Sequence, residues 1–197
     1  MTPERTAALA VILALALPAA AQTKGPYEVK SGIIEQGVPG MPEVVYFDDY
    51  GLKEATYTTI DMGGPASHKL KLELPDGTTY DIDLDDKTGT MMRIPPEVAK
   101  AMAAAMAPAM MKGAKVKDLP GKEFLGRKCK GTEAEAMGML TRTWSYKGII
   151  LYSEVSSARA QGPGKPMIIR ATKLTEGPVT AEKFKVPAGV KILGGNQ

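Results

Sequence analysis

The 197-residue sequence predicts a mainly β protein of the α+β class, in which an antiparallel sheet is accompanied by one short helix. Residues 27–94 contain short stretches in which apolar and polar side chains alternate, separated by turn sequences rich in Gly, Pro and Asp. Residues 97–112 instead form an Ala-rich segment typical of a helix, and strand-like stretches return after it. We expect residues 22–197 to form a single β-rich domain that contains this helix.

The first 21 residues have the three parts of a secretory signal peptide. Arg5 belongs to a weakly basic start, residues 7–17 are an unbroken apolar run, and the alanines at 19–21 provide a cleavage site before Gln22. An apolar run of this length is too short to cross a bilayer, which takes roughly 20 helical residues. We therefore expect a cleaved signal peptide and a periplasmic or secreted protein with no transmembrane span in its mature chain.

The first β section is expected to be an antiparallel meander, because each strand-like stretch is followed at once by a turn sequence. In the stretch that begins at Leu70, leucines alternate with charged residues, which predicts one buried and one solvent-exposed face. The expected strands of this section are 27–34, 44–47, 52–60, 70–74, 80–85 and 90–94.

An acidic row in this section raises the question of a metal site. Asp81, Asp83 and Asp85 occupy the first, third and fifth positions of an EF-hand-like loop. The match then fails, because Asp86 stands where the loop requires Gly and Met92 stands where it requires a bidentate Glu. A solvated strand face explains the row better, and we expect no metal site there.

The segment 97–112 is expected to be helical, with Pro96 suited to its first turn and Gly113 beyond its end. Pro108 lies inside it and predicts a kink or a break. Methionines recur at a spacing of four and share one face of this helix: Met102, Met106 and Met110, with Met111 alongside. Three interpretations stay open, namely packing onto the sheet, an adaptable apolar surface that faces a ligand, and a Cu(I) site built from thioethers.

A second β section follows the helix. Gly113, Pro120 and Gly121 predict an irregular basic linker over 112–122. The pair Lys147-Gly148 predicts a tight hairpin, and Trp144 lies on its first strand. The remaining expected elements are strands at 141–146, 149–156 and 167–175, a Gly- and Pro-rich loop at 158–166, and a helical turn near 181–184.

Composition and motifs argue against most kinds of catalysis. Cys129 is the single cysteine and His68 the single histidine, so no internal disulfide can form, and neither residue lies in a nucleophile motif. No G-x-S-x-G elbow and no phosphate-binding loop is present in the sequence. A net charge of +3, evenly scattered, is too mild for nucleic-acid binding. We expect a protein that is not an enzyme and carries no cofactor.

Four segments carry a resemblance that spans nearly the whole mature chain: 46–55, 125–129, 144–151 and 184–190. They resemble an exported bacterial family known only as a domain of unknown function. The strand–helix–strand order is also similar to the LolA-like fold of outer-membrane lipoprotein carriers. This resemblance implies a curved antiparallel sheet in the form of an open half-barrel, with the Met- and Ala-rich helix as its lid.

These observations favour a non-catalytic envelope binding protein that holds a lipid or an acyl-chain-like apolar ligand under the Met-rich helix. The candidate ligand-binding residues are Met102, Met106, Met110, Met111 and Trp144. The alternative is an envelope protein-interaction or structural module without a small ligand, and a third is a copper-binding protein that uses the Met stripe. A carrier predicts an apolar cavity beneath the helix, an interaction module predicts a filled core with an exposed apolar patch, and a copper site predicts converging thioethers.

Overall fold

The structure is a computed structural model, and it describes residues 25–111, 113–136, 138–157 and 166–193. The expected signal peptide, 1–21, and most of the expected loop at 158–166 lie outside the described residues. Within the described chain, one sheet holds all the strands, in the order β12-β6-β5-β4-β3-β2-β1-β11-β10-β9-β8-β7. The strands are β1 (Gly32–Val38), β2 (Met41–Asp48), β3 (Lys53–Ile60), β4 (Ser67–Glu73), β5 (Thr78–Asp83), β6 (Thr88–Arg93), β7 (Lys115–Phe124), β8 (Arg127–Ala136), β9 (Met139–Tyr146), β10 (Ile149–Ser157), β11 (Met167–Glu176) and β12 (Lys191–Ile192).

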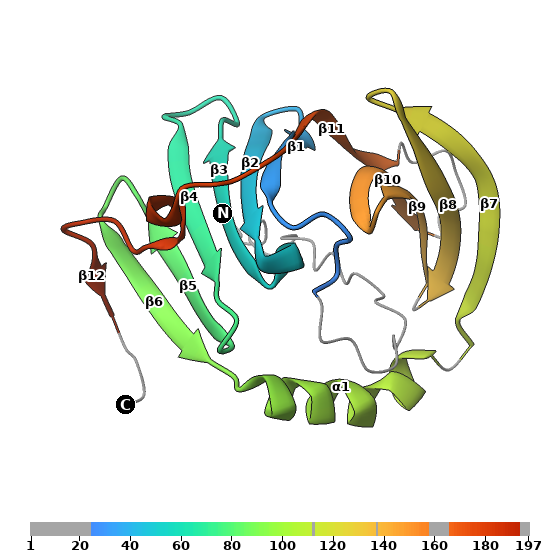
Figure 1. Cartoon of the computed structure of the whole chain (residues 1–197), viewed down its shortest axis with the longest axis horizontal. Coiled ribbons are helices and arrows are strands. Elements are labelled where there is room, and N and C mark those ends of the chain that lie inside the picture. Colours follow the sequence, from blue (N-terminus) through green and yellow to red (C-terminus); the bar gives the residue numbers. More distant parts are fainter. Residues whose placement is uncertain (1–24, 112, 137, 158–165, 194–197) are drawn as a thin grey trace, which may run out of the picture.

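The sheet consists of two meanders joined at its centre. Strands β1–β6 form the first wing and strands β7–β11 form the second, and within each wing consecutive strands pair antiparallel. Antiparallel pairing of β1 with β11 joins the wings, while the short β12 adds to β6 in parallel. The sheet curves into an open half-barrel, and α1 (Pro96–Met111) runs across its open side from β6 to β7 (Figure 1). The predicted mainly β half-barrel with one short helix is confirmed.

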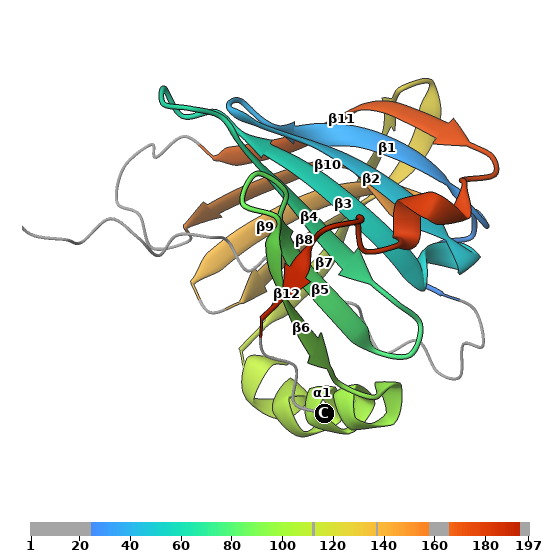
Figure 2. The ribbon, with the colours of Figure 1, turned by 90° about the vertical axis from the view of Figure 1, so that its left-hand side faces the viewer.

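The outer face of the first wing is covered by the chain that follows β11. This segment includes the 3-10 helical turn η2 (Ala181–Phe184), which lies against the outside of the first wing (Figure 2). Phe184 is buried there with the side chains of Ala55, Leu70, Leu72 and Ile82. The alternation that began at Leu70 therefore turns its leucines outward under η2, and the intervening charged residues line the concave face.

A second core lies on the concave side at the centre of the sheet. It contains Phe47, Trp144, Ile149 and Leu151, each at most 3% exposed, with Tyr27 and Val29 from the segment before β1. The Tyr27 ring meets the Phe47 ring edge-on, with centroids 5.0 Å apart. The floor of the half-barrel is therefore filled by side chains.

The segment before β1 differs from the expected strand at 27–34, because the strand begins only at Gly32. The Tyr27 N–H donates to the carbonyl oxygen of Tyr50, and the Glu28 N–H donates to that of Lys147. These acceptors belong to two different turns, so the segment crosses the sheet end instead of pairing along one strand. The crossing is tight, since a Cβ at Gly148, where φ is +83°, would lie 2.3 Å from the Pro26 oxygen.

The prediction of an irregular linker at 112–122 is wrong, because β7 begins at Lys115. Proline has no N–H to donate, and Gly weakens a strand interior, but both are tolerated at sheet edges and bulges. β7 is the edge strand of the second wing, and its pairing with β8 shifts register between Leu119 and Lys122, which brackets Pro120 and Gly121. The edge position and the irregularity together accommodate both residues.

Candidate binding surface

Helix α1 is the most exposed apolar element of the described chain. Every residue of α1 whose side chain is described, Pro96 to Pro108, is exposed. Val98, Met102 and Met106, spaced four residues apart, are 44%, 50% and 53% exposed and so share one side of the helix. We call these three side chains the α1 stripe. No strand packs extensively against α1, so within the described chain the stripe has no apolar layer to cover it.

Local sequence explains why a helix forms here without a sheet to support it. Alanine has the highest helix propensity, and six of the residues between Pro96 and Pro108 are alanines. Pro96 occupies the first helical position, and the Pro95 carbonyl accepts from the N–H groups of Val98 and Ala99 at 2.9 and 3.0 Å. The helix continues through Pro108 as one element to Met111, so the expected break is not present. The side chains of Met110 and Met111 lie outside the described part of the chain.

Trp144 is placed apart from the methionines. Its side chain is 3% exposed in the concave core, and its Nε1–H donates to the Pro120 carbonyl oxygen at 3.1 Å. The Phe124 ring lies tilted against it, the Tyr152 ring meets it edge-on, and Lys122 Nζ lies 4.0 Å from the centre of the Trp144 ring. The structure therefore brings Met102 and Met106 together on α1 and places Trp144 among the sheet side chains.

Charged side chains line the concave face on both wings. On the first wing, Lys69 pairs with Asp83 across β4 and β5, and Lys71 pairs with Glu73 at 2.9 Å. Hydrogen bonds from the backbone N–H of Asp86 and from Lys69 hold the pKa of the Asp83 carboxyl below its usual value. These neighbours keep Asp83 ionised, so this wall is polar.

The second wing carries a matching cluster around Arg142. Its guanidinium Nε donates to Glu133 at 2.7 Å, and its NH1 lies 3.8 Å from Glu154. Lys117 also pairs with Glu133 at 2.9 Å, and hydrogen bonds from Lys117 and Arg142 lower the pKa of the Glu133 carboxyl. This wall is therefore ionised as well.

The negative charge of one carboxylate on the concave face, that of Glu54, has fewer neighbours that stabilise it. Glu54 of β3 lies directly opposite Glu73 of β4 and accepts a hydrogen bond from Tyr27. Burial raises the pKa of Glu54, against the lowering effect of the Tyr27 hydrogen bond. Burial and the nearby Glu54 charge also raise the pKa of the Tyr27 hydroxyl, so that group stays protonated.

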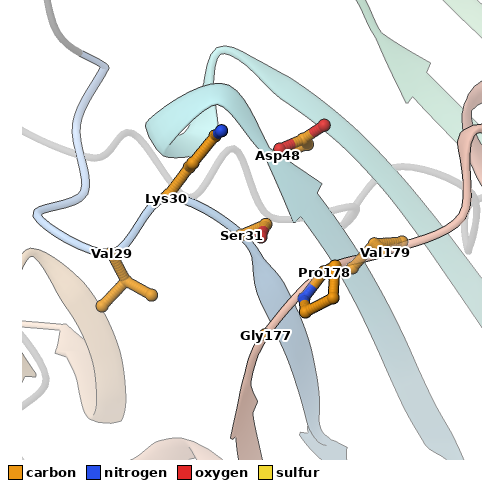
Figure 3. Close-up of a pocket in the computed structure, with 7 residues that line it drawn as sticks. All are labelled: Val29, Lys30, Ser31, Asp48, Gly177, Pro178 and Val179. Atoms are coloured by element: carbon orange, nitrogen blue, oxygen red, sulfur yellow. The ribbon is translucent and has the colours of Figure 1, made fainter.

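Two hollows of the described chain contain no α1 residue in their lining. The larger, about 460 Å³, lies between the start of β1, the end of β2 and the chain after β11 (Figure 3). It is lined by Val29, Lys30, Ser31, Asp48, Gly177, Pro178 and Val179. Asp48 is engaged there, because its carboxylate accepts from the Asp49 N–H at 2.8 Å. The smaller, about 210 Å³, contains Arg142 and Glu154, which are already ion-paired.

The described residues offer no assembled centre for nucleophilic or metal chemistry. Cys129 is 5% exposed on β8, and burial raises the pKa of its thiol, so the thiolate is disfavoured. His68 lies on β4 of the other wing, where its Nδ1 is 2.9 Å from Asp85 Oδ1. Among the residues in the structure, no three His, Cys, Asp or Glu side chains gather closely enough to hold a metal ion. The described part also contains no helix with the length and apolarity that a membrane crossing requires.

Sequence comparisons identify no relative: no known family model matches the chain, and no curated protein matches it. Solved structures do match. A crystal structure of MucB is similar with a TM-score of 0.50 and 12% identity, covering 85% of this chain and 61% of that one. MucB in complex with MucA(peri) gives a TM-score of 0.47 at 9% identity, and PNGF-II gives 0.47 at 10% identity. These cover 83% and 82% of this chain.

The likeness to MucB concerns the fold, and it agrees with the LolA-like half-barrel implied by the sequence resemblance. The chain spans 61% of that MucB structure, 56% of the MucB in the complex and 30% of PNGF-II. The family of unknown function that the four sequence segments resemble remains a prediction.

Proposed function

We propose that this chain is an exported, non-catalytic binding protein of the bacterial envelope that docks an apolar surface of a partner protein on α1. The observation that carries the proposal is the α1 stripe: Val98, Met102 and Met106 are about half exposed and no strand packs extensively against their helix. Exposed apolar patches of this kind mark interaction sites. Methionine suits the role because its flexible thioether adapts to irregular partners.

The filled concave floor favours a protein partner over an enclosed small ligand. An acyl chain needs a cavity that buries most of its surface. The central concave side chains, such as Phe47 and Trp144, are already buried by one another, and both walls carry ionised pairs such as Lys69–Asp83 and Arg142–Glu133. Removing such pairs from water beside a hydrocarbon chain is costly.

A lipid or acyl-chain ligand held under α1 is the second candidate. It is favoured by the course of α1, which crosses the open side of the half-barrel as a lid would (Figure 1). This candidate assigns ligand contact to Met102, Met106, Met110, Met111 and Trp144. A copper site on the same methionines requires thioethers that converge on one point, whereas Met102 and Met106 are both about half exposed on the helix.

Site-specific photo-crosslinking in the native envelope tests the proposal. A photoreactive phenylalanine analogue replaces Ala103, next to the stripe, in the full chain with its N-terminal segment intact. A matched position is Lys128, an exposed residue of β8 far from α1 in the sheet. We expect a protein adduct from position 103 that is absent from position 128 and is lost in the M102Q/M106Q variant, because Gln keeps the length of Met but not its apolarity.

Two other outcomes would contradict the proposal. No adduct at position 103, or an adduct that persists unchanged in M102Q/M106Q, would show that the stripe is not a docking surface. Native mass spectrometry of the protein from the same envelope provides the second arm: a bound mass of a lipid that M102Q/M106Q lacks would favour the acyl-ligand candidate, and a bound copper mass would favour the metal one.

A further inference from the structure

We propose that Met102 and Met106 of α1 are sites of methionine oxidation, and that their conversion to sulfoxides switches off docking on α1. The inference rests on the proposed docking function, because it names a chemical control of the same surface. Both thioethers belong to half-exposed side chains, so a small oxidant reaches them from solvent. They lie one turn apart on one side of the helix, and the stripe has only Val98 as a further member.

The methionines of the described chain lie outside its two buried cores. Neither buried core contains a methionine, and no methionine is among the side chains packed against them. Methionine in a core would disrupt packing when oxidised, whereas oxidation at the surface changes polarity without opening the sheet. The structure thus keeps oxidisable thioethers away from the residues that hold the fold together.

The single cysteine, Cys129, is not an accessible target for a small oxidant. Thiol oxidation requires the thiolate and access to solvent. Cys129 is 5% exposed, its Sγ–H donates to the Arg127 carbonyl oxygen at 3.4 Å, and it lies in the concave core beside Trp144. The exposed methionines are therefore the accessible sulfur groups of the described chain.

The chemistry requires a peroxide as co-reactant. The thioether sulfur attacks one peroxide oxygen, an S–O bond forms and the O–O bond breaks. The departing hydroxide takes the proton from the oxygen now bound to sulfur, which leaves the sulfoxide and one water. Sulfur loses two electrons and the peroxide gains them. The reverse reaction uses a dithiol, which becomes a disulfide as the sulfoxide oxygen leaves as water. The product side chain is polar, so Met102 and Met106 would no longer present an apolar surface.

Leucine at both positions removes the thioether chemistry and leaves apolar side chains, so the variant is compared with itself before and after peroxide. M102L/M106L retains apolar side chains of similar size but cannot form a sulfoxide. Met62 gives a matched control, because it is 77% exposed on the turn between β3 and β4 and belongs to neither α1 nor a core. M62L therefore removes a thioether that is more exposed than Met102 and Met106, from a place where docking is not proposed.

The test combines peptide mass spectrometry with the position-103 crosslink after treatment of the envelope with hydrogen peroxide. We expect one added oxygen on Met102 and on Met106, and loss of the adduct in the wild-type chain and in M62L. In M102L/M106L, whatever adduct forms before peroxide treatment should form to the same extent after it. Incubation of the oxidised protein with methionine sulfoxide reductases and a dithiol should restore the adduct. Unoxidised Met102 and Met106 under conditions that oxidise Met62 would overturn the switch. So would a peroxide-induced loss of the M102L/M106L adduct, relative to the untreated variant, as large as the loss in the wild type.

The two proposals fail in distinguishable ways. If the unoxidised chain gives no α1-dependent adduct, the docking function fails. If the adduct forms and peroxide leaves it unchanged while Met102 and Met106 carry oxygen, docking stands and the switch fails.

Discussion

Replacing Met102 and Met106 by Ala should leave the free energy of unfolding nearly unchanged. A methionine in a packed core costs about 2–5 kcal/mol when truncated to Ala, because burial is lost and a cavity remains. Here the two side chains are 50% and 53% exposed and no strand packs extensively against their helix. Met102 and Met106 are four residues apart on the helix, where such a pair contributes about 0.2–0.5 kcal/mol, and Ala has a helix propensity more favourable than Met by a few tenths of a kcal/mol. We expect a change below about 1 kcal/mol for the double variant.

Urea unfolding followed by tryptophan fluorescence measures this change, because Trp144 is the sole tryptophan and is 3% exposed in the folded protein. Leu72→Ala on β4 is the matched control: Leu72 is fully buried under η2, so its truncation should cost about 2–5 kcal/mol. If M102A/M106A lost more than about 3 kcal/mol, α1 would be packed as part of the core and the reasoning that makes it a docking surface would be refuted.

Three further predictions concern stability. Burial raises the pKa of Glu54, so the folded state holds the Glu54 proton more tightly than the unfolded chain, and the free energy of unfolding falls as pH rises through that pKa. Glu54→Gln should therefore raise the urea midpoint at neutral pH, with a gain that shrinks towards about pH 4. A lower midpoint at neutral pH would contradict this. Hydrogen bonds from Lys117 and Arg142 lower the pKa of Glu133, so its contribution is present at neutral pH and lost as pH falls below about 4; Glu133→Gln should flatten the acid limb of a pH titration of stability. Gly148→Ala should lower the free energy of unfolding by at least about 1 kcal/mol more than Gly126→Ala. Both glycines have positive φ, but only at Gly148 would the added Cβ lie against a backbone oxygen. Equal losses would show that the segment around Pro26 moves aside at no cost.

The β meander could be predicted from the sequence because its strands carry their own signals. Leucines alternate with charges after Leu70, and Lys147-Gly148 marks a hairpin that the structure contains between β9 and β10. β7 could not be predicted in the same way. Pro120 and Gly121 are poor strand residues, and only the edge position and the shifted pairing with β8 make them acceptable, neither of which a local pattern reveals.

The sequence predicts that the methionines of the candidate surface share one helix face, but not whether that face is exposed. The spacing of Met102 and Met106 placed them on one helix face, but the same spacing fits packing onto the sheet and exposure to solvent equally well. Whether the face is packed or exposed depends on where the fold places the helix. Here α1 follows β6 and precedes β7, and these strands place it across the open side of the half-barrel (Figure 1). Trp144 illustrates the opposite case: its Nε1–H bond to the Pro120 carbonyl links residues 24 positions apart, which periodicity does not indicate.

The pairing of β1 with β11 has a consequence for how the chain reaches this fold. Within each wing, neighbouring strands are also consecutive in the sequence, so each wing can form from contacts between residues that are close along the chain. The β1–β11 ladder instead joins Gly32 to Glu176 and closes a loop that contains nearly the whole domain. Loop closure over such separations slows folding. We therefore expect the two wings to form early and the β1–β11 ladder to form last. Trp144 fluorescence should then report the folding of the second wing before that ladder is complete.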